Sequence, residues 1–202
     1  NTNSPFSINL LNFAPNENID TSLIEANAKF MCIYKKLTQS PKFKNLFVDT
    51  FEESKDLNIT FKTSNTLSNS TNGKIIPKSI SINPLNGQII NANIEILINK
   101  NSLIHNSAIS NARTIMHESI HAYLIIKQYG CDQGTPFDDL GDVGLAETLN
   151  QYYLECAPQQ GQHEFMFNFM IQTMSEILAD IKDSLIPLSH QHEAESYMFI
   201  NE

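Results

Sequence analysis

Residues 114 to 125, TIMHESIHAYLI, contain His117 and His121 four positions apart, with Glu118 directly after the first histidine. Residues four apart on a helix lie above one another on the same face, so two imidazoles at this spacing can converge on one cation. Zinc accepts neutral imidazole nitrogen, and a catalytic zinc site uses three protein ligands and leaves the fourth position to water. The spacing therefore predicts His117 and His121 as two ligands of Zn²⁺.

Glu118 would project beside the open position of such a site. Zinc lowers the pKa of the water it binds, and a neighbouring carboxylate can then accept the proton. This combination is the HExxH pattern of zinc metallopeptidases. The alternative interpretation is a helix whose two histidines are satisfied structurally, because a five-residue match also arises by chance.

The third zinc ligand must come from elsewhere, and two downstream residues are candidates. His163, in QHEFMFNFM, stands at the start of the last long helical segment. Glu147, in GLAETLNQYY, lies at a separation from His121 that glutamate-liganded zinc peptidases also use. Either residue could instead be an ordinary polar side chain of an exposed helix, so the residues alone leave the choice open.

The first elements that could position these residues are two amphipathic helices. Ser22 and Glu25 match a capping box, which predicts that the first helix begins at Ser22. Ser40 followed by Pro41 predicts the start of the second, because proline is preorganised for the first helical position. Both predicted helices precede the first predicted strand.

Apolar and polar residues then alternate in three segments, which is the pattern of half-buried strands. These segments are residues 57–61, 80–82 and 94–98. Asn72-Gly73 and Asn86-Gly87 lie between them and suit tight turns that need a positive φ. The pattern predicts a small, mostly antiparallel sheet.

The helical period returns from about residue 106 to 129, around the HExxH residues, and is expected to stop at Gly130 as a C-cap. Further helical segments are predicted at residues 144–156 and 163–184, and Pro187 should close the last one. The sequence thus predicts an α+β fold, with the sheet packed against helices and the HExxH helix at the centre.

Residues 1 to 21 are predicted to be an irregular lead-in, and residues 22 to 202 a single domain. The strand NIEILIN, just before the central helix, has two possible roles. It could be an edge strand that pairs with an extended peptide substrate, or it could be an ordinary strand inside the sheet.

Composition excludes several classes of partner. The net charge is −9 and the 13 Lys and Arg are scattered, so nucleic acid is not expected as a partner. The three cysteines lack CxxC spacing and are odd in number, which argues against a disulfide framework or a zinc ribbon. No apolar run approaches the roughly 20 residues that span a bilayer. The chain is therefore expected to be soluble. It begins at Asn1 rather than Met, which suggests a processed bacterial product or part of a longer protein, so the sequence does not indicate its compartment. It does not indicate the oligomeric state either.

The run from NIEILINKN through ISNARTIMHESIHAYLI to GQHEFMFNFMIQTMSEIL resembles the SprT-like zinc-peptidase domains found in proteins of Bacteroidetes bacteria. The likeness extends from about residue 25 to 184. Two groups of residues match the motifs of those domains. They are Ala112, Arg113, Thr114, Ile115, His117, Glu118, Ile120, His121 and Ala122 on the central helix, and His163, Glu164 and Met166 in the later segment.

This resemblance implies a zincin-like metallopeptidase fold that binds Zn²⁺ through His117, His121 and His163, with Glu118 as the catalytic residue. It favours His163 over Glu147, and it implies a protein or peptide substrate. The chain departs from the SprT and Spartan proteins because it lacks their zinc-ribbon tail and any basic DNA-binding tract, so repair of DNA-protein crosslinks is not carried over. The alternative function is a zinc-binding or toxin-associated interaction module that keeps the scaffold without cleaving peptides.

Overall fold

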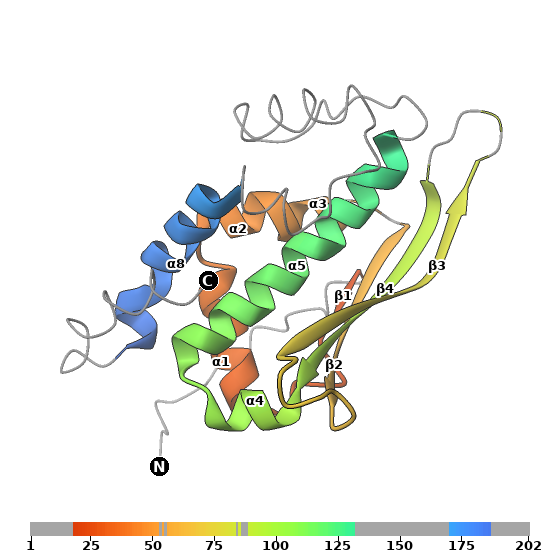
Figure 1. Cartoon of the computed structure of the whole chain (residues 1–202). Coiled ribbons are helices and arrows are strands. Elements are labelled where there is room, and N and C mark those ends of the chain that lie inside the picture. Colours follow the sequence, from red (N-terminus) through yellow and green to blue (C-terminus); the bar gives the residue numbers. More distant parts are fainter. Residues whose placement is uncertain are drawn as a thin grey trace, which may run out of the picture.

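The computed structural model describes residues 18–52, 54, 56–83, 85, 89–131 and 170–186, with the backbone alone for residues 127–131. The described elements form a sheet and a layer of helices, which Figure 1 colours by their position along the chain. Their bounds are β1 (Ile19–Asp20), α1 (Ala28–Leu37), α2 (Pro41–Phe43), the π-helix η1 (Lys44–Val48), α3 (Asp49–Glu52), β2 (Leu57–Ser64), β3 (Gly73–Ile82), β4 (Ile89–Asn99), α4 (Lys100–His105), α5 (Ala108–Cys131) and α8 (Ile171–Leu185).

The four described strands form one mixed sheet in the order β1-β2-β4-β3. β1 pairs with β2 and β2 with β4 in parallel, whereas β3 and β4 are antiparallel. The expected mostly antiparallel sheet is therefore wrong, although the α+β prediction is confirmed. The reason is topological: the chain passes from β2 to the far edge, forms β3, and returns as β4 between the two, so β4 runs in the same direction as β2.

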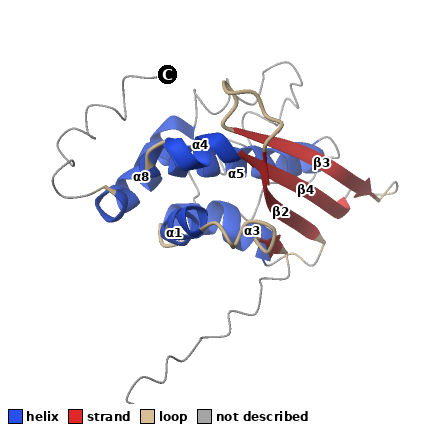
Figure 2. Ribbon diagram, turned by 90° about the horizontal axis from the view of Figure 1, so that it is seen from below, coloured by secondary structure: helices blue, strands red, loops and turns tan. Residues whose placement is uncertain are grey.

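The strand NIEILIN belongs to β4, which lies inside the sheet between β2 and β3. Of its two possible roles, the interior strand is the one observed. The edge beside β4 is β3, and Figure 2 shows β2, β4 and β3 side by side with β3 outermost. Pro77 lies within β3, as expected of an edge strand, because proline has no N–H to donate to a second neighbour.

The core lies between the helices and one face of the sheet. β4 contributes four buried side chains to this face: Ala92, Ile94, Ile96 and Ile98. Against them packs a cluster of aromatic rings with centroid separations of 5.1 to 6.1 Å: Phe30, Tyr34, Phe43, Phe47, Phe51 and Phe61. α5 packs against β3 and β4 on one side and against α1 and α8 on the other, so it is the helix that joins the sheet to those two helices (Figure 1).

The first helix begins later than predicted, whereas the second begins where it was predicted to begin. Asn27, not Ser22, is its N-cap, since the Asn27 side chain accepts a hydrogen bond from the Phe30 amide at 2.9 Å. Residues 22 to 26 form turns, and β1 lies within the predicted lead-in. The second helix begins at Pro41 as predicted and continues through η1 and α3.

The later helices agree more closely with the sequence pattern. Extended backbone at Asn106 separates the short α4 from α5, and α5 passes through Gly130 to Cys131, one residue beyond the predicted stop. α8 ends at Leu185, and Ile186 is extended at φ −109° and ψ 125°, as a residue before proline prefers. The predicted helix at residues 144–156 and the Asn86-Gly87 turn lie outside the described residues. Among the described helices, none is long and apolar enough to cross a membrane.

Candidate metal centre

α5 brings the two motif histidines together. The Nε2 atoms of His117 and His121 lie 3.1 Å apart, and the ring centroids are 4.6 Å apart with the planes at 86°. Two imidazole nitrogens bound to one tetrahedral zinc at about 2.0 to 2.1 Å would be separated by roughly 3.3 Å. The pair therefore fits two ligands of one zinc ion with only a small adjustment.

Burial along α5 singles out the face on which these histidines lie. From residue 111 to 126 every position is buried except four, which recur at a spacing of four residues. These four positions are Arg113, His117, His121 and Ile125. A ligand can therefore approach this part of α5 only along one stripe, and both imidazoles lie on it.

Glu118 lies beside this stripe but is almost enclosed, with 8 % of its surface exposed. Its side chain packs against Gly73 at the start of β3, where a Cβ atom would lie 2.6 Å from the Glu118 Cγ and 2.8 Å from Oε1. Burial raises the pKa of the Glu118 carboxyl from its ordinary 4.5 to about 7. A carboxyl with this pKa can both accept and release a proton near neutral pH.

The raised pKa predicts how the stability of the zinc-free chain depends on pH. The folded carboxyl keeps its proton up to about pH 7, whereas the unfolded one releases it near 4.5. The contribution of Glu118 to stability is therefore complete below pH 4.5 and is lost as the pH rises through 7, a loss of roughly 3 kcal/mol. Urea unfolding of wild type and Glu118→Gln across this pH range, with a chelator present to remove zinc, measures this loss of stability. Parallel pH profiles for the two proteins would contradict the assignment.

The start of β3 has a defined hydrogen-bonding register. The Asn99 amide donates to the Asn72 carbonyl at 2.8 Å, and Gly73, Ile75 and Pro77 stand opposite Ile98, Ile96 and Ile94. Because hydrogen-bonded pairs alternate along an antiparallel ladder, the backbone groups of Gly73 and Ile75 point away from β4. Among the described strands, the outer edge of the sheet therefore begins beside Glu118.

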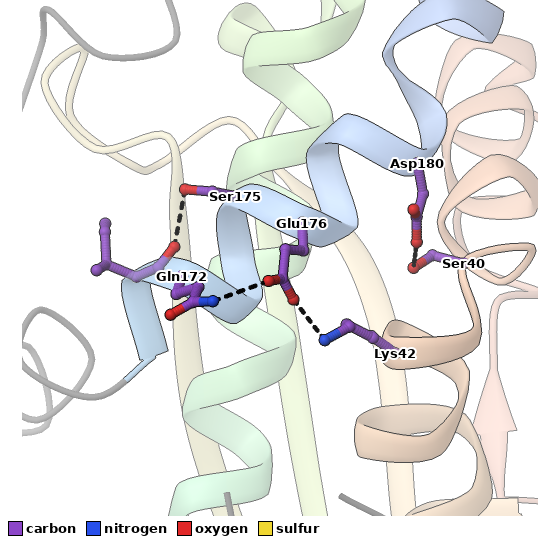
Figure 3. Close-up of polar contacts among 7 residues, drawn as sticks. Ser40, Lys42, Gln172, Ser175, Glu176 and Asp180 are labelled. Atoms are coloured by element: carbon purple, nitrogen blue, oxygen red, sulfur yellow. Dashed lines mark hydrogen bonds and ion pairs between the residues drawn. The ribbon is translucent and has the colours of Figure 1, made fainter. Parts of the chain in front are cut away.

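α8 is fixed to the corner between α1 and α2 by polar contacts that Figure 3 shows. The Ser40 hydroxyl donates to Asp180 Oδ2 at 2.7 Å and Lys42 pairs with Glu176, while within α8 the Gln172 side-chain amide donates to Glu176 at 3.0 Å. Four apolar side chains on the helix are buried beneath this seam: Met174, Ile177, Leu178 and Ile181. The helix that follows the His163 segment is thereby held in the layer that contains α5.

The third ligand is not placed by these observations, because His163 and Glu147 lie outside the described residues. Within the part of the chain that is described, no group of three or more His, Cys, Asp and Glu side chains could hold a metal ion. The described structure supplies two imidazoles that fit zinc, and the residue after the first of them, Glu118, turns its buried carboxyl toward Gly73. A full coordination shell needs at least one further residue.

Two features of the site were missed by the sequence prediction: the edge position of β3 and the contact between Gly73 and Glu118. A signal for the first exists, since Pro77 within an apolar run indicates an edge strand. Comparisons with protein-family models, curated proteins and solved structures found no significant match to the chain.

Proposed function

We propose that the chain is a zinc-dependent metallopeptidase with a zincin-like fold, in which His117, His121 and His163 bind Zn²⁺ and Glu118 is the general base. The observation that supports it most is the arrangement on α5: two imidazole nitrogens lie 3.1 Å apart on the accessible stripe of residues 111–126, and the residue after His117 is Glu118, a buried carboxyl of raised pKa. Zinc content measured together with protein cleavage by wild type and Glu118→Ala tests the proposal.

In the proposed reaction, the zinc ion and the Glu118 carboxyl would have separate roles. A zinc ion held by the histidines would polarise the scissile carbonyl and increase the acidity of water. Glu118 would accept the proton of the attacking water and then deliver it to the leaving amine. Its enclosure beside Gly73 limits the positions that the carboxylate can adopt during both transfers. No covalent intermediate with the chain is required.

The substrate would be an extended peptide that pairs with the free edge of β3. The outward-pointing backbone groups of Gly73 and Ile75 can each donate and accept, while Pro77 can only accept. Main-chain pairing of this kind recognises extended peptide with little dependence on its sequence. The proximity of Gly73 to Glu118 would bring the paired peptide next to the proton acceptor.

A module that binds zinc without cleaving peptides is the rival function. Such a module would need the two imidazoles but would gain nothing from Glu118, since burial of an ionisable carboxyl destabilises the fold near neutral pH. A buried carboxyl that destabilises the fold and has a raised pKa is typical of a catalytic site. The chemistry of Glu118 therefore favours the enzyme.

Substitution of the two candidate third ligands should separate two classes of zinc peptidase. We expect His163→Ala to weaken zinc binding by at least about 100-fold. Loss of a residue that only orients a metal ligand already reduces metal affinity about 10- to 100-fold, and loss of the ligand itself should have a larger effect. Glu147→Ala should leave the affinity within about threefold of wild type. Competition with a chromophoric chelator measures both. The opposite result would place the chain among the glutamate-liganded enzymes.

A further inference from the structure

The contact between Gly73 and Glu118 is tighter than a side chain at position 73 would allow. An ideal Cβ built on Gly73 lies 2.6 Å from Cγ, 2.8 Å from Oε1 and 2.9 Å from Cδ of Glu118. Carbon atoms in contact are normally about 3.5 to 4.0 Å apart. An alanine here would therefore force either the strand or the glutamate side chain to move.

The strand end is not free to move. The backbone carbonyl of Asn72 accepts a hydrogen bond from the backbone N–H of Asn99 at 2.8 Å, and the side-chain oxygen of Asn72 accepts one from the Ser102 hydroxyl at 2.7 Å. The Asn99 side chain in turn donates to the carbonyls of Ser68 and Thr71 at 3.0 and 2.8 Å. These bonds fix the residue before Gly73 to the end of β4 and to α4. An added methyl group would consequently displace Glu118 rather than the backbone.

We propose that Gly73 is a positioning residue for Glu118: by lacking a side chain, it forms the slot in which the carboxylate lies between α5 and the start of β3. The assignment rests on the proposed peptidase function for its catalytic part. Its structural part, the steric coupling of residues 73 and 118, stands on the distances alone. The slot also places the edge of β3, the outermost of the described strands, against Glu118, so one glycine would link substrate binding to proton transfer.

Catalysis tests the positioning role through a double-mutant cycle in the zinc-loaded chain. Gly73→Ala should lower kcat about 10- to 100-fold, because a misplacement of about 1 Å at a reacting group has an effect of this size. KM and zinc content should stay near the wild-type values. In the Glu118→Ala background the same change at Gly73 should produce no further loss. Lys74→Ala is the matched control, since this exposed neighbour stands opposite Leu97 on the other face of the strand.

Thermal unfolding of the zinc-free chain tests the contact without reference to activity. Gly73→Ala should lower Tm by about 3 to 10 °C when Glu118 is present, as overpacking does in a domain of this size. With alanine at position 118 the change should be within about 1 °C, because the opposing atoms are gone.

Three results would overturn the inference in different ways. An equal Tm change in both backgrounds, including no change in either, shows that the two residues do not oppose each other. A coupled Tm loss with unchanged kcat removes the positioning role. An inactive wild type overturns the peptidase function and the catalytic part of the inference, while the thermal cycle still decides the contact.

Discussion

Glu118→Gln should lower kcat/KM for hydrolysis of an unfolded protein substrate by about 10²- to 10⁴-fold, the range that general acid-base catalysis contributes. Glutamine has nearly the same shape as glutamate and fills the same space beside Gly73, but it cannot accept the proton of the attacking water. The two imidazoles on α5 are unaffected, so bound zinc should equal that of wild type. The loss should therefore fall on kcat, measured from initial rates with a fluorescently labelled protein, at constant zinc occupancy.

Glu95→Gln is the matched control for this substitution. Glu95 is half-buried, whereas Glu118 is buried, and it lies on the opposite face of the sheet, where it pairs with Lys62 and Lys78. Its replacement should change kcat/KM by less than about twofold. If Glu118→Gln cleaves as fast as wild type, or if gently purified chain contains no zinc, the hydrolase function is excluded. Zinc without cleavage in wild type would favour the binding module.

The helical part of the site was largely predictable from the sequence. The apolar period around HExxH predicted a continuous helix, and the observed α5 runs from Ala108 to Cys131. A spacing of four residues necessarily places His117 and His121 on one face. Helix geometry is local, and this is why the relative position of the two imidazoles followed from spacing alone. The start of α1 was harder to predict, because Ser22 and Asn27 are both favourable N-cap residues and tertiary packing selects between them.

The sheet was predictable only as a set of strands. Alternation of apolar and polar residues reveals that a segment is half-buried, but it contains no information about which strand lies beside it or in which direction. β1 has only two residues, Ile19 and Asp20, too few for any period to be visible. Pro77 carried the missing information on the edge, since a proline inside a strand indicates one side without a partner.

The contact of Gly73 with Glu118 could not be read from the sequence at all. The two residues are far apart in the chain, and they meet because β3 occupies the edge over α5. Asn72-Gly73 was expected to form a turn, whereas Gly73 is the first residue of a strand and is paired with Ile98. The glycine is explained by close approach of a side chain, one of the uses of glycine that local pattern does not distinguish from a turn.

His117→Ala and His121→Ala should each abolish the stabilisation that zinc gives to the chain. At a free zinc concentration of 100 times Kd, binding stabilises the folded state by about 2.7 kcal/mol, which raises Tm by about 5 to 10 °C in a domain of this size. Removal of one of two imidazole nitrogens that lie 3.1 Å apart leaves a single described ligand on α5. We expect affinity to fall at least about 100-fold, so the same zinc concentration should raise Tm by less than about 2 °C.

His105→Ala is the matched control for both variants, because His105 is an exposed histidine at the end of α4, outside the stripe on α5. Its response to zinc, followed by differential scanning calorimetry with and without chelator, should equal that of wild type. The comparison separates a site that requires both imidazoles from zinc held by scattered surface histidines. If His117→Ala or His121→Ala kept the full Tm increase, the two nitrogens could not share one ion. The 3.1 Å separation of the two Nε2 atoms would then be a structural contact only, and the proposed role of Glu118 in a zinc-dependent reaction would fail.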